Sequence, residues 1–348
     1  MTGEVSSSAE EVGDTTTPHE PPLSARILRR IGPANVGLVV ALVVLCAAIR
    51  TQSDKIFLLG NIINIGVAVA ILGVLAVAQM VVVISGGLDI SIGSTTSLTT
   101  VVVAMALHHG VPTGLGVLIA LGVGLAAGAV NGLIVIAMRI NAIIVTLATF
   151  SGFAGIAYVL SKGLQIAVNG KFFLDLGTNK LAGIPYPVWV LAVFALLTHL
   201  FIRYTVAGRH IFAMGSNEAA ARNTGISLAR YRLGVYAYAG LAGGVAGLLS
   251  IASNGLGEAT TAGADQGLTA ITAALLGGAA LTGGRGSIPG AVLGVILLGV
   301  LDNGLVLMNA NPFYSQIVVG CLLIVAVGLQ QSGVFDRMTS RARKARVS

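Results

Sequence analysis

The sequence predicts an all-α integral membrane protein with about ten transmembrane helices, and composition is the first reason. Of the 348 residues, 55% are apolar and only 9% are charged, whereas a soluble domain carries about 25% charged residues. The mean hydropathy of +0.92 leaves too little charge to cover a water-soluble body of this size. The same apolar excess excludes disorder for most of the chain. Glycine contributes 47 residues without a collagen-like period, which favours close helix packing in lipid.

Ten apolar segments have the length of a bilayer-spanning helix, which needs about 20 residues. They are residues 34–49, 57–84, 90–107, 115–138, 140–160, 187–202, 233–252, 266–282, 290–308 and 312–330. The second segment is long and runs into Ser85, Gly86 and Gly87, which predicts a broken or tilted span rather than a straight one. Together the ten segments define one transmembrane domain, residues 34–330.

Polar segments flank this domain. Residues 1–25 contain five acidic residues and no lysine or arginine. A secretory signal opens with positive charge and reaches its apolar core sooner, so this stretch does not predict a cleaved signal. We expect residues 1–33 to form a disordered acidic cytoplasmic tail that ends in basic residues, and residues 331–348 to form a basic cytoplasmic tail.

The distribution of basic residues predicts the direction of the spans. With the amino terminus in the cytoplasm, 15 of the 20 lysines and arginines fall on inner segments. The outer segments hold only Arg50, Lys55, Lys162, Lys171 and Lys180. This bias follows the positive-inside rule and predicts that both termini are cytoplasmic. It also accounts for the net charge of +7 without a nucleic-acid partner.

Small residues recur at every fourth position in residues 115–138. They are Gly116, Ala120, Gly124, Gly128 and Gly132, and the spacing returns in Gly240 with Gly244, Gly243 with Gly247, and Gly290 with Gly294. Because such residues share one helix face, a neighbouring backbone can approach closely. We expect this packing within one chain; a subunit interface is the alternative.

Two glycine-rich motifs echo each other. The run GGLDISIGS covers residues 86–94, and the run GGRGSIPG covers residues 283–290. Each follows an apolar span predicted to run from outside to inside, which is typical of a parallel repeat of two halves. Glycine-rich composition alone is the other explanation.

The longest polar segment on the predicted inner side is residues 203–232. It predicts a short helix between two glycines, with a capping residue, an acid in the first turn and three alanines. The residues are Gly215, Ser216, Asn217, Glu218, Ala219, Ala220, Ala221, Arg222 and Gly225, with Ser216 or Asn217 as the cap. Ser227 is predicted to cap the next helix. A docking element for a cytoplasmic partner is one interpretation, and a solvated basic connector is the other.

Asp89 lies between two apolar spans, and an acid at the centre of a span costs about 2.5–3.5 kcal/mol on insertion scales. Two placements avoid that cost. Asp89 either lies at the inner interface or caps a broken helix that faces a polar cavity. In the second placement Asp89, Ser91 and Ser94 meet hydroxyl-rich solutes.

Further polar residues within the apolar segments favour a water-filled path, with interhelical hydrogen bonds as the alternative for each. Asn61, Asn64 and Gln79 have spacings that fit one face of the second segment. The complete candidate path consists of Asn61, Asn64, Gln79, Gly86, Gly87, Asp89, Ser91, Ser94, Asp302 and Asn303.

The sequence lacks the common motifs of catalysis. The nearest match to a phosphate-binding loop, residues 278–283, continues with Gly284 and Arg285 instead of Lys and Ser or Thr. Zinc-protease, nucleophile-elbow and cysteine-cluster patterns are also missing from the sequence. Cys46 and Cys321 fit small apolar positions. We therefore predict no catalytic residue, no metal and no cofactor.

Three runs together carry a resemblance to a known family. The runs GGLDISIGS, GSNEAAARNTGIS and GGAALTGGRGSIPGAVLGVILLGVLDNGLVLM resemble, in order, the membrane permeases of bacterial ribose-type sugar ABC importers, over roughly residues 35–335. The resemblance implies a cobalamin-importer-like (type II) ABC permease fold and a homodimer. It also implies a cytoplasmic ABC ATPase subunit, an extracytoplasmic sugar-binding protein, and a coupling helix to the ATPase supplied by residues 215–226.

Two places depart from the family pattern. Family members usually carry a Glu and an Asp two positions apart, where this chain has Gly267 and Thr269, with Asp265 just upstream. They also often have Asn where Asp302 stands. Both departures bear on the substrate more than on the mechanism.

The predicted function is the permease subunit of an ATP-binding-cassette importer in the cell membrane, which moves a monosaccharide or related polyol and hydrolyses no ATP itself. One alternative is a proton-coupled secondary transporter of a small polar solute, with Asp89 or Asp302 as the titrating acid. Another is a non-transporting membrane scaffold or receptor.

Overall fold

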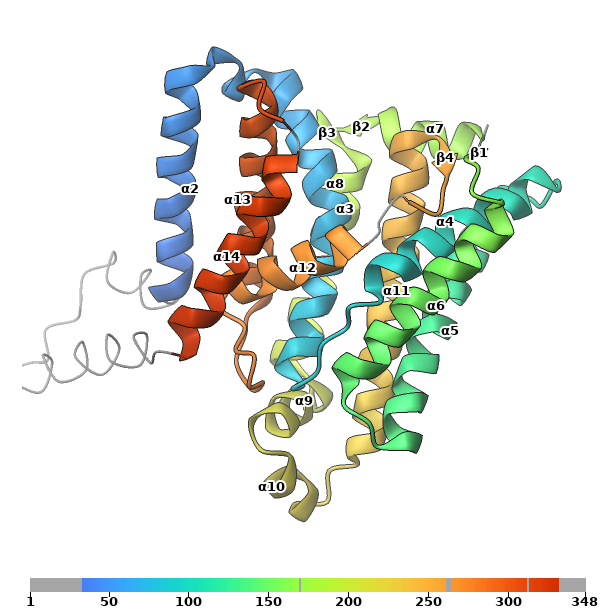
Figure 1. Cartoon of the computed structure of the whole chain (residues 1–348), viewed down its shortest axis with the longest axis vertical. Coiled ribbons are helices and arrows are strands. Elements are labelled where there is room, and N and C mark those ends of the chain that lie inside the picture. The colour runs from blue at the N-terminus through green and yellow to red at the C-terminus, as the bar shows by residue number, and fades with distance from the viewer. Residues whose placement is uncertain (1–32, 169, 261–263, 312, 332–348) are drawn as a thin grey trace, which may run out of the picture.

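The computed structural model describes residues 33–168, 170–260, 264–311 and 313–331, and these residues form a helical bundle (Figure 1). The two predicted tails, residues 1–33 and 331–348, lie outside the described residues apart from Pro33 and Gln331, which belong to helices.

Ten helices coincide with the ten apolar segments. They are α2 (Pro33–Gln52), α3 (Leu59–Ile84), α4 (Ile92–His108), α5 (Thr113–Met138), α6 (Ala142–Ser161), α8 (Tyr186–Tyr204), α11 (Leu228–Asn254), α12 (Ala264–Leu276), α13 (Ile288–Leu307) and α14 (Phe313–Gln331). Within the described residues, seven of them are long and apolar enough to cross a membrane, namely α2, α3, α5, α6, α8, α11 and α13. The other three are shorter in their apolar part, and α12 has only 13 residues.

α12 ends at Leu276, before the predicted end of its segment at residue 282, because the chain turns at a pair of glycines. Gly278 has a φ of +89°, a left-handed conformation that favours glycine. A methyl group on Gly277 would lie 2.5 Å from the carbonyl carbon of Gly290, so α13 approaches closely at this point. At about 1.5 Å of rise per residue, the 13 residues of α12 cover about 20 Å, less than a bilayer core of roughly 30 Å.

The second predicted segment forms one continuous helix. α3 runs for 26 residues and ends at Ile84; Ser85 is its C-cap, and Gly86 then adopts a left-handed φ of +84°. The break that the sequence indicated therefore lies after the helix and not within it.

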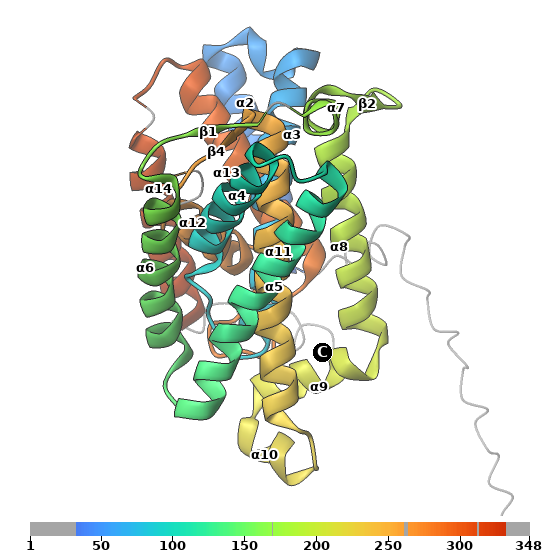
Figure 2. The same ribbon diagram turned by 90° about the vertical axis from the view of Figure 1, so that its right-hand side faces the viewer.

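The shorter elements gather at the two ends of the bundle. They are η1 (Asp54–Phe57), α7 (Lys171–Thr178), α9 (Val206–Ser216), α10 (Glu218–Asn223), β1 (Ile166–Ala167), β2 (Lys180–Leu181), β3 (Ile184–Pro185) and β4 (Leu256–Gly257). Antiparallel β1 and β4 pair Ile166 with Gly257, and antiparallel β2 and β3 pair Lys180 with Pro185. The strands and α7 lie at one end, which we call the strand end; α9 and α10 lie at the opposite end, which we call the α10 end (Figures 1 and 2).

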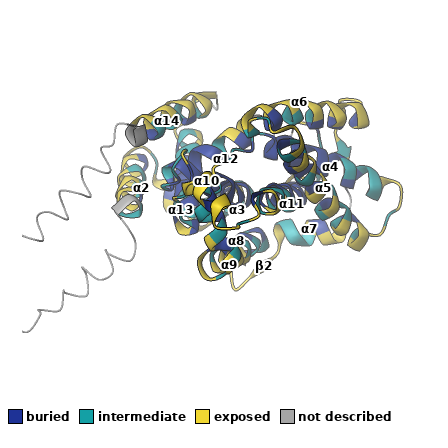
Figure 3. Ribbon diagram, turned by 90° about the horizontal axis from the view of Figure 1, so that it is seen from below, coloured by how far each residue is buried: buried dark blue, intermediate teal, exposed yellow. Residues whose placement is uncertain are grey.

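α3 and α11 form the centre of the bundle. In each, 78% of the most apolar stretch is buried, compared with 11% for α2 and 22% for α6 and α8. Seen along the bundle, buried residues gather toward the middle and exposed residues lie on the outer helices (Figure 3). Many of the exposed residues are large and apolar, such as Val44, Val159 and Ile324. An apolar outer face fits lipid, which solvates such side chains as well as a protein interior does.

α5 packs against α11 through the predicted glycine face. A methyl group on Gly124 would lie 2.3 Å from the Gly240 carbonyl oxygen, and one on Gly128 would lie 2.1 Å from the Tyr236 carbonyl oxygen. No side chain fits between these backbones, so the prediction of packing within one chain is confirmed. The other predicted pairs also meet neighbouring segments. Gly243 and Gly247 lie against Thr95 and Thr99 of α4, Gly294 lies against Ala273 of α12, and Gly290 lies against Gly277 directly after α12.

Both ends of the described chain, the start of α2 and the end of α14, point toward the α10 end (Figure 1). The α5–α6 connection with Arg139, the α12–α13 connection with Arg285, and the arginine-rich residues 203–232 lie toward the same end. The five basic residues predicted to be outside belong to elements and connections at the strand end. Among the described basic residues, those predicted to be inside therefore lie toward the α10 end, and those predicted to be outside lie at the strand end.

Replacing Gly128 by alanine tests the α5–α11 contact. The added methyl group meets the Tyr236 backbone, so the helices must separate, and we expect the free energy of unfolding to fall by about 1–3 kcal/mol. Gly122 of the same helix has no neighbouring atom within 4 Å of an added methyl group, so alanine there leaves stability unchanged or slightly higher. Thermal unfolding in detergent compares the two variants, and equal losses at both positions would contradict the contact.

Candidate functional site

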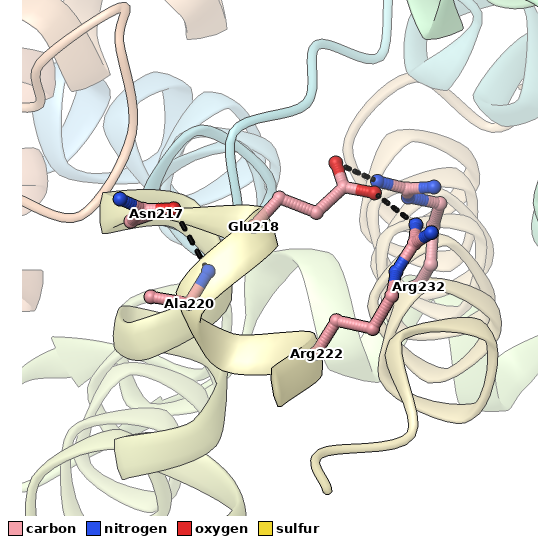
Figure 4. A network of polar contacts seen from close by, with 5 residues as sticks. All are labelled: Asn217, Glu218, Ala220, Arg222 and Arg232. Atoms are coloured by element: carbon pink, nitrogen blue, oxygen red, sulfur yellow. Dashed lines mark hydrogen bonds and ion pairs between the residues drawn. The ribbon is translucent and has the colours of Figure 1, made fainter. Parts of the chain in front are cut away.

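α10 is the short helix that the sequence predicts. The Asn217 side chain caps it by accepting a hydrogen bond from the Ala220 backbone N–H at 3.0 Å (Figure 4). Glu218 lies in the first turn, where the helix dipole favours an acid. Gly225 follows with a φ of +82° and allows the chain to turn back toward α11.

α9 precedes α10, and the sequence analysis missed it. Its cap is Thr205, which accepts a hydrogen bond from the Gly208 N–H at 3.1 Å. Gly215 and Ser216, predicted to lie before and at the cap of α10, are the last two residues of α9. Ser227 lies at the predicted start of α11, but its side chain makes no capping hydrogen bond.

α10 is anchored on one side. Ala221 is buried against apolar side chains of α9 and α11. Glu218 pairs with Arg222 on the next turn at 3.2 Å and with Arg232 of α11 at 2.9 Å (Figure 4). These ion pairs are largely exposed, so each contributes about 0–1 kcal/mol and orients the helix more than it stabilises it.

The other face of α10 is exposed at the extreme end of the molecule (Figure 2). It consists of Asn217, Ala219, Ala220, Arg222 and Asn223. A capped helix that is anchored on one side and free on the other has the geometry of a docking element, and that role stays a prediction.

A cavity of about 810 Å³ lies between α3, α11, α12, α13 and α14, a volume typical of small-molecule sites. Its polar lining is Asn64, Ser250, Ser253, Asn254, Asp265, Gln266, Thr269, Thr272, Asp302, Ser315 and Gln316. Asn64 is near the start of α3 and Asn254 ends α11, which places the cavity toward the strand end. Of the predicted path residues, Asn64 and Asp302 line it.

The cavity contains two carboxylates, and each accepts a hydrogen bond from α14. Asp265 Oδ2 of α12 accepts from Gln316 Nε2 at 2.8 Å. Asp302 Oδ1 of α13 accepts from the Ser315 hydroxyl. The first turn of α14 is therefore hydrogen-bonded to both α12 and α13. A solute in the cavity would reach the same carboxylates.

Sequence reasoning missed most of the cavity lining, although α12 carried a usable signal. Asp265, Thr269 and Thr272 have the i, i+4, i+7 spacing that places polar groups on one helix face. The α11 lining residues Ser250, Ser253 and Asn254 have the i, i+3, i+4 spacing of one helix face as well, whereas Ser315 and Gln316 of α14 are adjacent and give no such signal.

Asn61 and Asn303 form a reciprocal amide pair between α3 and α13. Asn61 Nδ2 donates to Asn303 Oδ1 at 2.9 Å, and Asn303 Nδ2 donates to Asn61 Oδ1 at 2.8 Å. For these two residues the structure therefore shows interhelical hydrogen bonds, the alternative to a place on a water-filled path. Neither lines the cavity, although Asn64 lies only one helical turn from Asn61.

Asp89 is buried in the connection between α3 and α4, away from the cavity lining. Its Oδ1 accepts hydrogen bonds from the Ser91 N–H at 2.9 Å and the Ser91 hydroxyl at 2.6 Å. Asn131 Nδ2 of α5 donates to the same hydroxyl at 2.7 Å. In the amide orientation that satisfies its hydrogen bonds, the Gln79 side-chain nitrogen donates to the Asp89 backbone carbonyl at 3.2 Å, and its oxygen accepts from the Asp89 backbone N–H at 3.2 Å. The acid thus fixes the α3–α4 connection against α5.

The asparagine pair predicts a thermodynamic coupling. Replacing Asn61 or Asn303 by leucine leaves the other amide without its partner, so we expect each single variant to lose about 1 kcal/mol of stability. The double variant should lose less than the sum of the two single variants. Asn64→Leu, on the cavity wall, is the control and should change stability least. Reversible unfolding in mixed micelles measures all four proteins, and additive losses would contradict the pair.

Comparison with known proteins identifies related permeases. The family model described as "Branched-chain amino acid transport system / permease component" matches residues 61–327. The chain is 35% identical over 292 residues to the ribose import permease protein of Escherichia coli K12, an alignment that covers 83% of this chain and 91% of that protein. No solved structure matches the chain significantly.

Two further relatives cover similar shares. A probable ABC transporter permease protein of Sinorhizobium fredii is 36% identical over 306 residues, which is 88% of this chain and 90% of that protein. The L-arabinose ABC transporter permease protein of Azospirillum brasilense is 32% identical over 314 residues, which is 89% of each. The chain therefore belongs to this family of ABC transporter permease components and is a non-catalytic, multi-pass protein of the cell membrane.

Proposed function

We propose that the chain is the translocation subunit of an importer that carries a monosaccharide or a related polyol across the cell membrane. The observation that carries the proposal is a polar cavity at one end of a bundle whose other end presents a capped, exposed helix. Relatives named for ribose import and L-arabinose transport support this solute class.

The cavity lining fits a neutral solute with many hydroxyl groups. The carboxylates of Asp265 and Asp302 accept hydrogen bonds, and the amides and hydroxyls around them both donate and accept. The described lining residues include no lysine or arginine. An amino-acid solute would find carboxylates for its ammonium group but no lysine or arginine for its carboxylate among these residues, so the lining favours a sugar over the solutes in the family model's description.

The partners follow from the two ends. At the α10 end we propose contact with a cytoplasmic ABC ATPase subunit, made by the segment that contains Gly215, Ser216, Asn217, Glu218, Ala219, Ala220, Ala221, Arg222 and Gly225. Its exposed face meets the partner, while the buried Ala221 and the closely packed Gly215 hold that face in place. At the strand end an extracytoplasmic sugar-binding protein delivers the solute. A second copy of the chain completes the permease.

The proposed architecture is a ten-helix, cobalamin-importer-like (type II) fold with both termini cytoplasmic. The start of α2 and the end of α14, which both point toward the α10 end, support it, because an even number of crossings returns a chain to the side on which it began. The arginines of residues 203–232 support a cytoplasmic α10 end. Short α4 and α12 fit this architecture, since backbone that leaves the helix at membrane depth is tolerated inside a protein.

In the proposed mechanism the solute enters the cavity from the strand end and displaces α14 groups from the carboxylates. Closure of the ATPase on ATP then moves α10, and the path turns from outward facing to inward facing. Binding in the cavity is weak, because the sugar-binding protein provides the selectivity.

Transport in vesicles separates ATP-driven import from proton-coupled transport. With the ATPase and the binding protein present, we expect uptake of D-ribose or L-arabinose to require ATP on the cytoplasmic side. Uptake should persist when the proton gradient is collapsed, because no protein acid has to titrate in each cycle. Uptake that needs the gradient and no ATP would replace the proposal with a secondary transporter that titrates Asp89 or Asp302.

Disrupting α10 should uncouple the permease from its ATPase. Glu218→Lys reverses one charge in both ion pairs, and Gly225→Pro is incompatible with a φ of +82°. We expect the double variant to lose the ATPase on co-purification and to lose uptake by about tenfold or more, which corresponds to about 1.4 kcal/mol of contact free energy. Lys180→Glu, a charge reversal at the strand end, is the control and should keep the ATPase. Normal ATPase binding and uptake by the double variant would contradict the coupling role of α10.

A further inference from the structure

Gly215, at the end of α9, lies directly against the end of α3. A methyl group on Gly215 would lie 1.8 Å from the Ile84 carbonyl oxygen and 2.8 Å from the Gly284 backbone nitrogen. The Gly284 N–H in turn donates a hydrogen bond to the same Ile84 oxygen at 2.8 Å. Three segments far apart in the chain therefore meet backbone to backbone.

Two more glycines, Gly283 and Gly86, take part in the contact between α9 and the end of α3. A methyl group on Gly283 would lie 2.6 Å from the Gly215 carbonyl oxygen and 2.9 Å from the Gly86 Cα. Gly86, Gly283 and Gly284 all have left-handed φ angles, of +84°, +82° and +71°. The left-handed backbone conformation disfavours a side chain at all three positions, and a methyl group on Gly283 or Gly284 would also lie within 2.7 Å of neighbouring backbone. We call Gly86, Gly215, Gly283 and Gly284 the glycine junction.

The glycine junction explains why the two glycine-rich motifs echo each other. GGLDISIGS begins at Gly86 and GGRGSIPG begins at Gly283, so each motif starts where it meets α9. Gly86 of the first run and both glycines of the second run lie at the junction, whereas a methyl group on Gly87 would meet the Tyr236 hydroxyl of α11. This reason for the match requires neither a repeat of two halves nor chance composition.

The segments that meet at the glycine junction continue to the walls of the cavity. α3 runs from Ile84 to Asn64, which lines the cavity about 30 Å away at 1.5 Å per residue. The Gly283–Gly284 turn connects α12 and α13, which supply Asp265 and Asp302. On the other side, Gly215 is separated from the α10 cap, Asn217, by a single residue. The junction thus lies between the proposed docking helix and both carboxylate-bearing walls.

We infer that Gly215 is a positioning residue for transport, and that the glycine junction passes displacement of α10 to α3 and to the α12–α13 connection together. Backbone in direct contact has no side-chain rotamers that could absorb a displacement, and packed interiors have low compressibility. The Glu218–Arg232 ion pair, which also joins α10 to α11, connects two long and partly exposed side chains and is therefore soft. The inference rests on the proposed coupling role of α10.

Gly215→Ala tests the inference in the complete transporter, with its ATPase and its binding protein, in proteoliposomes. ATP hydrolysis and uptake of D-ribose or L-arabinose are measured on the same preparation, and the readout is solute imported per ATP hydrolysed. We expect that ratio to fall about tenfold, with ATPase retention and hydrolysis within about twofold of the parent protein. A merely structural defect would lower both activities together.

Gly234→Ala is the matched control. Gly234 lies in the first turns of α11 at the same end of the molecule, and an added methyl group there meets no atom within 4 Å. This variant should keep the parent ratio. A parent-like ratio in Gly215→Ala would overturn the inference.

Hydrogen exchange of the unmodified complex keeps the inference testable if Gly215→Ala does not fold. With ATP and vanadate, we expect altered exchange in residues 83–87 and 280–286 together with residues 212–223. The α5–α6 connection, residues 138–142, lies at the same end outside the junction and should not respond. A response confined to residues 212–223 would overturn the junction and leave α10 as the docking helix. No response in residues 212–223 would overturn the proposed function itself.

Discussion

Close approach of backbones is the constraint on which the rest of this bundle depends. Lipid solvates apolar side chains as well as a protein interior does, so helices in a membrane associate through packing and internal hydrogen bonds. The chain meets this constraint with glycine, which brings Gly128 against Tyr236 between α5 and α11 and Gly294 against Ala273 between α12 and α13. Because these contacts hold the inner helices together, the outer helices can present apolar side chains to lipid.

The same environment divides the internal polar residues into two groups. A polar group inside a membrane protein is costly unless it is hydrogen-bonded or faces a hydrated space. Asn61 and Asn303 satisfy each other, and Asp89 is satisfied by Ser91. Residues such as Asn64 instead line the cavity. Only the second group is available to a solute, so the candidate path is narrower than the set of polar residues in the apolar segments.

Much of the fold follows from the sequence, because helix length and capping depend on neighbouring residues. Apolar length predicts the ten helices, and Asn217 before an acid and three alanines predicts α10. The early end of α12 at Gly277 and the inclusion of Gly215 in α9 depend on contacts with distant segments, which local patterns do not contain. The cavity is harder still to predict. Asn61 and Asn64 are three residues apart, and only the rotation of α3 against α13 decides which one pairs and which one faces the cavity.

Side chains line the cavity, whereas backbone forms the glycine junction. Recognition of the solute and coupling to the ATPase therefore depend on different parts of the chain. Exchanging a cavity side chain changes which groups meet the solute and leaves the helix contacts in place. Two of the departures from the resembling family, at Thr269 and Asp302, fall on the cavity wall. The runs that carry the resemblance instead include Gly215 and Gly284, where any added side chain meets backbone. A permease built in this way can change its solute while the connection to its ATPase stays the same, because the two tasks depend on different atoms.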